Sequence, residues 1–181
     1  MSSLQKFITT AYSQVGYAEK PVNQTKYGRA FGLNGAQWCG LFVMWCGKMS
    51  RVSIPWTAYT PSGVKAFKDK KAWYTKNPKP GDLAYMDIPN DNLDRVSHVG
   101  IVVADLGTHV LTIEGNTSAS SGNQRNGGEV AVKQRPKTWI VGYGRPKFKD
   151  AKAPIIDEIV TKYAQAEKPK KSLFKRIKKN G

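Results

Sequence analysis

The chain has 181 residues, of which 40% are hydrophobic and 23% are charged. This length fits one domain with enough chain to bury a hydrophobic core without disulfide bonds. Its 29 Lys and Arg residues against 13 Asp and Glu residues give a formal net charge of +16, which predicts attraction to a polyanion such as nucleic acid, anionic lipid or an anionic cell wall. The sequence has no apolar stretch long enough to span a membrane, and its first residues lack the pattern of a secretory signal. We therefore expect a protein that is soluble when made.

The pattern of apolar residues predicts helices first and strands later. Helices are predicted over residues 4–18, 39–50, 62–71 (with Ser62 as N-cap) and 154–165, and strands over 82–87, 97–104, 109–114, 129–134 and 139–143. This order predicts an α+β fold in which N-terminal helices pack on a C-terminal antiparallel β-sheet. After Pro146 the composition changes to many lysines and few large apolar residues, which predicts a basic C-terminal tail that is partly helical.

Cys39 is the first residue of the predicted helix 39–50. Unpaired backbone N–H groups and the helix dipole favour an anion in the first turn, so a thiol there has a lowered pKa and becomes a better nucleophile. We expect Gly40 to keep the adjacent surface open for a substrate. The alternative interpretation is that Cys39 is a small core residue, which is how we interpret Cys46, deeper in the same helix.

The chain has two histidines, His98 and His109, that could act as a base for a cysteine nucleophile. In the predicted strand 97–104, His98 shares a face with Gly100, which leaves space beside the imidazole for another group. His109 follows a predicted hairpin turn and is expected to be more exposed. His98 is therefore the better candidate for the base.

The predicted hairpin also supplies a group that could orient the histidine. It places residues 109–116 alongside the strand of His98, so that Glu114 or Asn116 can reach a ring nitrogen. A hairpin with polar ends would explain either residue alone. However, a cysteine at a helix start, a histidine in a later strand and a polar residue in the adjacent strand form a papain-like order, which favours catalysis.

A zinc site is the competing interpretation of the same cysteines and histidines. Cys39, Cys46, His98 and His109 lack close-spaced ligand pairs, and two cysteines two turns apart on one helix chelate poorly. No phosphate-binding glycine loop or acidic calcium loop stands out in the sequence. We therefore expect no metal and no cofactor.

Four motifs in succession resemble those of the CHAP domain, a cysteine, histidine-dependent amidohydrolase or peptidase that is common in bacteriophage endolysins and bacterial wall hydrolases. The motifs are Gln37-Trp-Cys-Gly-Leu-Phe-Val43, Lys79-Pro-Gly-Asp-Leu-Ala-Tyr85, Ser97-His-Val-Gly-Ile-Val102 and Ile113-Glu-Gly-Asn116. The resemblance assigns residues 1–148 to a CHAP catalytic domain and leaves residues 149–181 as the basic tail.

The resemblance implies roles for residues at the motif positions. Cys39 would be the nucleophile, His98 the general base and acid, and Glu114 the residue that orients His98. Asn116 would assist Glu114 or hold the end of the hairpin. The backbone N–H of Cys39 and a second donor would bind the oxyanion, and the candidate substrate-binding or oxyanion residues are Gln37, Trp38 and Asn34. Some family members have an acidic calcium loop here, but residues 23–38 contain no Asp or Glu.

The implied reaction is hydrolysis of an amide bond in bacterial peptidoglycan, of the phage endolysin type. The bond is either N-acetylmuramoyl–L-alanine or one within the stem or cross-bridge peptide. The basic tail would bind anionic wall polymers or a membrane surface. We expect a monomer without a specific nucleic-acid partner, made in the host cytoplasm and acting on the wall after release, or associated with a virion. The alternative is a non-enzymatic protein that binds nucleic acid or another polyanion, which explains the charge but not the order of Cys39, His98 and Glu114.

Overall fold

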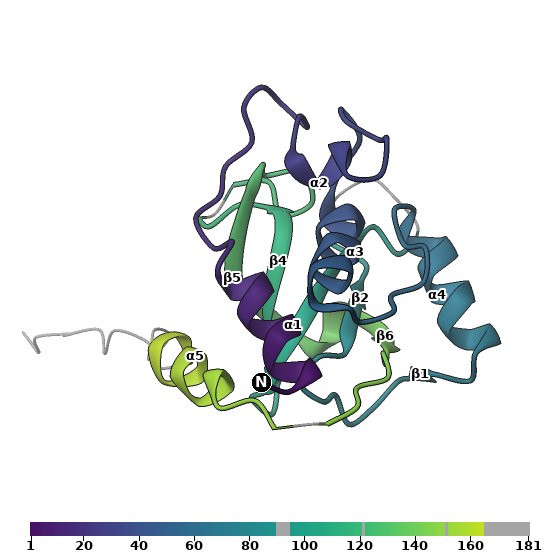
Figure 1. The fold of residues 1–181 in the computed structure, drawn as a ribbon, viewed down its shortest axis with the longest axis vertical. Helices are drawn as coiled ribbons and strands as arrows, with labels where there is room; N and C mark the ends of the chain where they lie inside the picture. The colour runs from purple at the N-terminus through teal and green to yellow at the C-terminus, as the bar shows by residue number, and fades with distance from the viewer. Residues whose placement is uncertain (90–94, 121, 151, 165–181) are drawn as a thin grey trace, which may run out of the picture.

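The computed structural model describes residues 1–89, 95–120, 122–150 and 152–164 (Figure 1). Its helices are α1 (Ser3–Tyr12), α2 (Lys26–Arg29), α3 (Cys39–Ser50), α4 (Thr60–Asp69) and α5 (Ile155–Tyr163), with a 3₁₀ turn η1 (Lys137–Trp139). Its strands are β1 (Trp73–Tyr74), β2 (Leu83–Met86), β3 (His98–Asp105), β4 (His109–Thr117), β5 (Glu129–Pro136) and β6 (Ile140–Gly144). None of the helices within these ranges has the length and apolar character needed to cross a bilayer.

The strands form one six-stranded antiparallel sheet in the order β1-β6-β2-β3-β4-β5. Helices α1 and α3 pack together and lie against β3 in the middle of this sheet (Figure 1). The predicted α+β fold is therefore confirmed. Two short elements, α2 and β1, were not expected from the sequence, because neither is long enough to show a periodic pattern.

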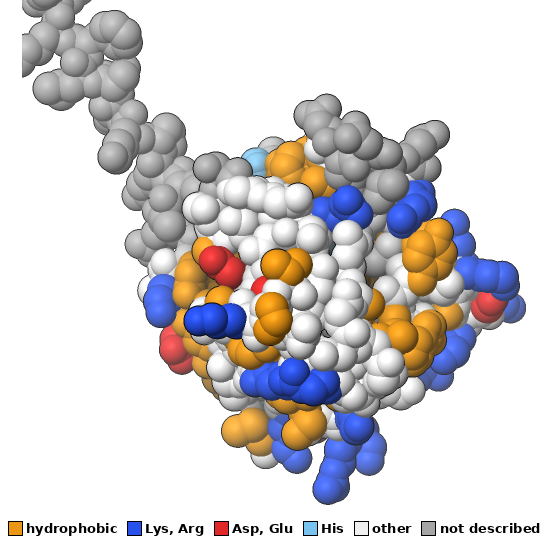
Figure 2. Space-filling model, turned by 90° about the horizontal axis from the view of Figure 1, so that it is seen from above, with side chains coloured by type: hydrophobic (Ala, Val, Ile, Leu, Met, Phe, Trp, Pro, Cys, Tyr) orange, Lys and Arg blue, Asp and Glu red, His pale blue; other side chains and the backbone are white. Residues whose placement is uncertain are grey.

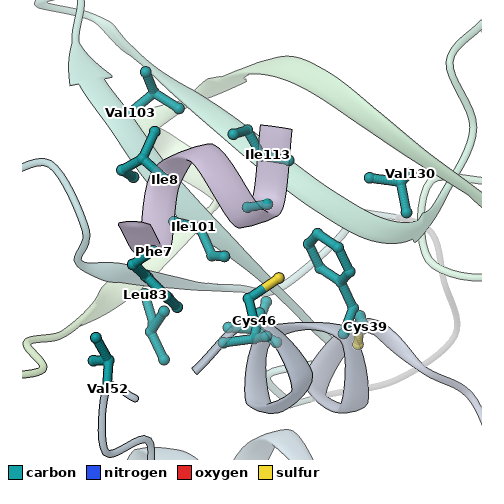
Figure 3. Close-up of a cluster of buried hydrophobic side chains, with 14 of the residues drawn as sticks. Phe7, Ile8, Cys39, Cys46, Val52, Leu83, Ile101, Val103, Ile113 and Val130 are labelled. Carbon is teal, nitrogen blue, oxygen red and sulfur yellow. The ribbon is translucent and has the colours of Figure 1, made fainter. Parts of the chain in front are cut away.

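Side chains of β3 point alternately to the two faces of the sheet, as expected for a strand, and each face has its own hydrophobic cluster. Val99, Ile101 and Val103 belong to the main core with α1 and α3, whereas Val102 belongs to a smaller cluster with residues of β2 and β6. Figure 3 shows the main core between α1, α3 and the sheet, with the Cys46 side chain pointing into it. Cys46 is fully buried, and burial raises the pKa of its thiol well above the usual value. Its interpretation as a core residue is confirmed.

Helix α1 is shorter than predicted. The hydroxyl of Ser2 accepts a hydrogen bond from the backbone N–H of Gln5 and caps the helix start. The chain leaves the helix after Tyr12 because Gly16, at φ +90°, donates its N–H to the carbonyl of Val130 in β5. The prediction of helix to residue 18 was therefore wrong, since pairing with the sheet edge replaces the last turns of the helix.

Helix α4 begins two residues earlier than predicted. Tyr59 is its N-cap, and Pro61 lies in the first turn, where its missing N–H costs nothing. Ser62 is therefore inside the helix, and the prediction that it caps the helix was wrong.

Helix α5 lies within the predicted tail and packs onto the domain. Ile159 is fully buried, and the rings of Tyr12 in α1 and Tyr163 in α5 meet edge to face with centroids 6.3 Å apart. The backbone N–H of Ile155 donates to Oε1 of Gln5 at 3.3 Å. The tail up to residue 164 therefore joins the core of the domain, and its remainder, residues 165–181, lies outside the described residues.

Candidate active site

Cys39 is the first residue of α3, as predicted. The preceding residue, Trp38, caps the helix without a side-chain hydrogen bond, so N–H groups of the first turn remain available for an anion. The backbone N–H groups of Gly40 and Val99 interact with the Cys39 sulfur. Cys39 is buried, with 5% of the residue exposed, and belongs to the main hydrophobic cluster.

Gly40 is required for packing and not for an open surface. A Cβ at this position would lie 1.9 Å from the carbonyl oxygen of Thr57. The segment at Thr57 and Ala58 therefore approaches the start of α3 so closely that only glycine fits. The expectation that Gly40 leaves room for a substrate was wrong.

His98 begins β3 and is fully buried. Its Nε2 lies 2.9 Å from Oε2 of Glu114. The other ring nitrogen, Nδ1, is buried and has no hydrogen-bond partner among the described residues. Because Cys39 and His98 are close enough to shift each other's pKa, Nδ1 is the nitrogen available to exchange a proton with the thiol.

The two side chains stabilise each other in their charged forms. Burial opposes ionisation of Cys39, but the neighbouring imidazole of His98, together with the backbone N–H groups of Gly40 and Val99, lowers the pKa of the thiol. Burial also opposes protonation of His98, but Cys39 and Glu114 outweigh it and raise the pKa of the imidazole to about 9. The arrangement therefore favours a thiolate beside an imidazolium.

Glu114 in β4 is the buried carboxylate that contacts His98. Gly100 makes this contact possible, because a Cβ at Gly100 would lie 2.6 Å from Cγ of Glu114. The expected role of Gly100 in leaving space beside the histidine is confirmed. Burial raises the pKa of Glu114, but the guanidinium of Arg135, and His98, lower it well below its usual range.

Arg135 in β5 is a member of this cluster that the sequence analysis missed. It pairs across the strands with Val110, whereas Glu114 pairs with Ala131, four residues earlier in β5. The long side chain therefore reaches back along the sheet to Glu114. An arginine near the end of a mixed strand gives no signal of this contact until the register of β4 and β5 is known.

Asn116 forms hydrogen bonds at the end of the hairpin and does not bond to His98. It adopts a left-handed backbone conformation at φ +58°, which asparagine tolerates better than most residues. Its Nδ2 donates to Oδ1 of Asn126 at 3.0 Å, and its Oδ1 accepts from the N–H of Gly128 at 3.3 Å. Of the two roles implied for Asn116, these contacts fit the second.

The three candidate substrate-binding or oxyanion residues lie in different environments. Trp38 is fully buried, stacks on Tyr27 and donates its indole N–H to Glu19 at 2.5 Å, so it is a core residue that does not face a substrate. Asn34 is exposed, and its Oδ1 accepts from the N–H of Thr25. Gln37 is exposed two residues before Cys39, and its Oε1 accepts from Arg125 at 3.3 Å.

Two of the four residues of the competing zinc interpretation, Cys46 and His109, lie apart from the pair of Cys39 and His98. Cys46 is in the core, and the ring of His109 lies at the hairpin turn with Nδ1 2.9 Å from the hydroxyl of Thr108. Across the part of the chain that the structure describes, no three His, Cys, Asp or Glu side chains come together in a way that could hold a metal ion.

This site has the papain-like order of a cysteine-type hydrolase. It combines a cysteine at a helix start, a buried strand histidine next to it and a carboxylate in the adjacent strand. The family model of the CHAP domain matches residues 31–116. This interval contains Cys39, His98, Glu114 and Asn116. The resemblance to the CHAP domain noted in the motifs is therefore confirmed over this interval.

Among the solved structures that are similar to this chain, two share low sequence identity with it. One is a protein described as similar to lipoprotein, of the NLP/P60 family, from Staphylococcus aureus subsp. aureus Mu50, with a TM-score of 0.45 and 13% identity over 79% of this chain and 41% of that chain. The other is Ly7917, with a TM-score of 0.48 and 17% identity over 79% of this chain and 62% of that chain. The chain thus spans less than two thirds of the length of either. No curated protein matches it in sequence.

Proposed function

We propose that this protein hydrolyses an amide bond of bacterial peptidoglycan by a cysteine–histidine mechanism, in the manner of a phage endolysin. The observation that carries the proposal is the contact between Cys39 at the start of α3 and a His98 that is itself hydrogen-bonded to Glu114. The CHAP domain at residues 31–116 supports peptidoglycan as the substrate.

The geometry supports a two-step reaction. The Cys39 thiolate attacks the amide carbonyl, and the backbone N–H of Cys39 is one donor to the oxyanion that forms. The imidazolium of His98 then gives its proton to the leaving amine as the C–N bond breaks, which leaves a thioester on Cys39. Neutral His98 next takes a proton from water, the hydroxide attacks the thioester, and the acid product leaves as the thiolate and imidazolium are restored.

Two scissile bonds are compatible with this mechanism. Cleavage of N-acetylmuramoyl–L-alanine releases a peptide with a new amino group on alanine and leaves a free carboxyl on the muramoyl sugar. Cleavage within the stem or cross-bridge peptide leaves the sugar attached to its first alanine. Mass spectrometry of the fragments released from several purified peptidoglycans separates the two.

The positive charge supports association with an anionic surface. The formal net charge is +16, and Lys and Arg side chains spread over the face shown in Figure 2, with few Asp or Glu among them. Helix α4 and the turn after it contribute four exposed lysines, Lys65, Lys68, Lys70 and Lys71. This charge would hold the enzyme to wall polymers or a membrane surface after its release from the host cytoplasm or from a virion.

The test is lysis of purified cell walls by variants of the two cysteines. We expect Cys39→Ala to abolish the fall in turbidity while it leaves the fold and wall binding intact. Cys46→Ala is the matched control, because Cys46 lies on the same helix but in the core, and it should lower stability without abolishing lysis. Undiminished lysis by Cys39→Ala refutes the proposal, and tight DNA binding that falls steeply with salt, without lysis of any wall, supports the non-enzymatic alternative.

A further inference from the structure

We propose that Arg135 is a positioning residue of this site, which holds Glu114 ionised and in one orientation so that Glu114 can fix the ring of His98 beside Cys39. The inference rests on the proposed cysteine–histidine function and adds a fourth side chain to it. Arg135 lies outside the CHAP match, which ends at residue 116.

Arg135 binds both oxygens of the Glu114 carboxylate. Its Nε donates to Oε1 at 2.8 Å, and one terminal nitrogen donates to Oε2 at 2.5 Å. The hydroxyl of Thr112 donates to Oε1 at 2.6 Å, and Nε2 of His98 lies beside Oε2. Each carboxylate oxygen therefore has two partners, so rotation of the carboxylate would break hydrogen bonds on both sides.

The guanidinium is itself held from three directions. It donates to Oγ1 of Thr117 in β4 at 3.0 Å and to Oε1 of Gln124 at 3.1 Å, and it lies 5.7 Å from the centre of the Trp139 ring. The side chain is 3% exposed. These contacts fix the orientation of the two guanidinium N–H groups that bind Glu114 before any substrate binds. A residue without contact to the reacting atoms can set their geometry in this way.

Charge balance gives Arg135 a second effect. When the site is ready to react, Cys39 and Glu114 are anions while His98 and Arg135 are cations, so the buried cluster is neutral. Removal of Arg135 leaves one net negative charge among buried groups, which binds a proton more readily. The further titratable group near Cys39 is Tyr85 of β2, and burial raises its pKa, so it stays neutral. The thiolate should therefore become protonated at a higher pH in the absence of Arg135.

The experiment measures the pH dependence of Cys39 alkylation by iodoacetamide in a Cys46→Ala background, together with the rate of wall lysis. We expect Arg135→Met to move the alkylation midpoint upward by about one pH unit or more and to slow lysis by about 10- to 100-fold. Arg135→Lys keeps the charge but loses the fork. It should return the midpoint toward the wild-type value while lysis stays slow.

Arg145→Met is the matched control. Arg145 forms the same kind of two-point contact with the buried carboxylate of Asp82, with both hydrogen bonds at 2.8 Å. Loss of that pair should lower stability and leave the alkylation midpoint unchanged. A folded Arg135→Met protein whose midpoint equals that of the wild type overturns the inference. A wild-type midpoint at the ordinary thiol value, about 8.5, overturns the proposed function instead.

Chemical rescue tests the same role if Arg135→Met does not fold. Arg135 lines a surface pocket of about 320 Å³ together with Gln124 and Trp139, so ethylguanidinium can enter the space left in Arg135→Ala. We expect ethylguanidinium to restore lysis more than ethylammonium at the same concentration, because only the former has two parallel donors. Equal effects of the two cations, or full lysis by Arg135→Ala alone, overturn the inference.

Discussion

Nε2 of His98 and Oε2 of Glu114 lie 2.9 Å apart, and both side chains are fully shielded from solvent. A buried hydrogen bond of this kind fixes the orientation of the imidazole, and the negative charge favours its protonated form. His98 is therefore presented to Cys39 in one rotamer, with Nδ1 as the nitrogen left for proton transfer.

Replacement of Glu114 by glutamine should lower both the stability of the protein and the rate of wall lysis. Glu114→Gln keeps the size of the side chain but leaves the buried guanidinium of Arg135 without its anion, so we expect stability to fall by about 3 kcal/mol. Because the imidazolium also loses its partner, wall lysis should slow by at least about 100-fold. Urea denaturation and turbidity assays measure the two effects. Glu158→Gln, on the exposed face of α5, is the control and should change neither.

Lysis should depend on pH in a bell shape. The rate needs the Cys39 thiolate, whose pKa is lowered, and the proton of His98, whose pKa is raised to about 9. We expect the rate to rise below the ordinary thiol pKa of about 8.5 and to fall near pH 9 as His98 loses its proton. Initial lysis rates on purified walls across this range measure both limbs. A rise centred near pH 8.5 would contradict the thiolate–imidazolium pair.

The free energy of unfolding should also depend on the protonation of His98. Its pKa is raised from about 6.5 in an unfolded chain to about 9 in the folded protein. The stabilisation is therefore complete below about pH 6.5 and is lost as the pH rises through about 9. Urea denaturation at about pH 6 and about pH 10 should show this loss. The loss should be smaller in His98→Asn, which has no such group, and an equal loss in both proteins would contradict the assignment.

Gly100→Ala should damage the site through a steric effect alone. The new Cβ would lie 2.6 Å from Cγ of Glu114, so Glu114 must move away from His98, and we expect a cost of about 1–3 kcal/mol together with loss of most lysis. Gly107→Ala is the control. Gly107 is at φ +85° in the β3–β4 turn with no atom near its added Cβ, so it should cost about 1–2 kcal/mol and leave the lysis rate of the folded protein unchanged.

Truncation after Ala164 should weaken binding to cell walls without slowing the catalytic reaction. It keeps α5, whose Ile159 is buried, and removes residues 165–181, which contain seven Lys and Arg residues and one Glu. We expect weaker binding to purified walls at physiological salt and the same rate at saturating wall concentration. A pull-down of the protein with walls at increasing salt measures the first effect. Unchanged binding would show that the charge of the domain alone is sufficient.

The local features of the site could be predicted from the sequence. The helix that starts at Cys39, the alternation around His98 and the space beside Gly100 all follow from side chains within a few residues of each other. Apolar periodicity sets which face is buried, and a helix start favours an anion whatever surrounds it. For this reason α3 has the bounds that its pattern predicted, Cys39–Ser50.

Only the tertiary structure decided the contacts between distant segments. Arg135 reaches Glu114 because of the register between β4 and β5, and Trp38 is a core residue because Tyr27 and Glu19 pack around it. Asn116 bonds to Asn126 and not to His98 for the same kind of reason. A register depends on the summed energies of many contacts along both strands, so no single side chain in the sequence reveals it.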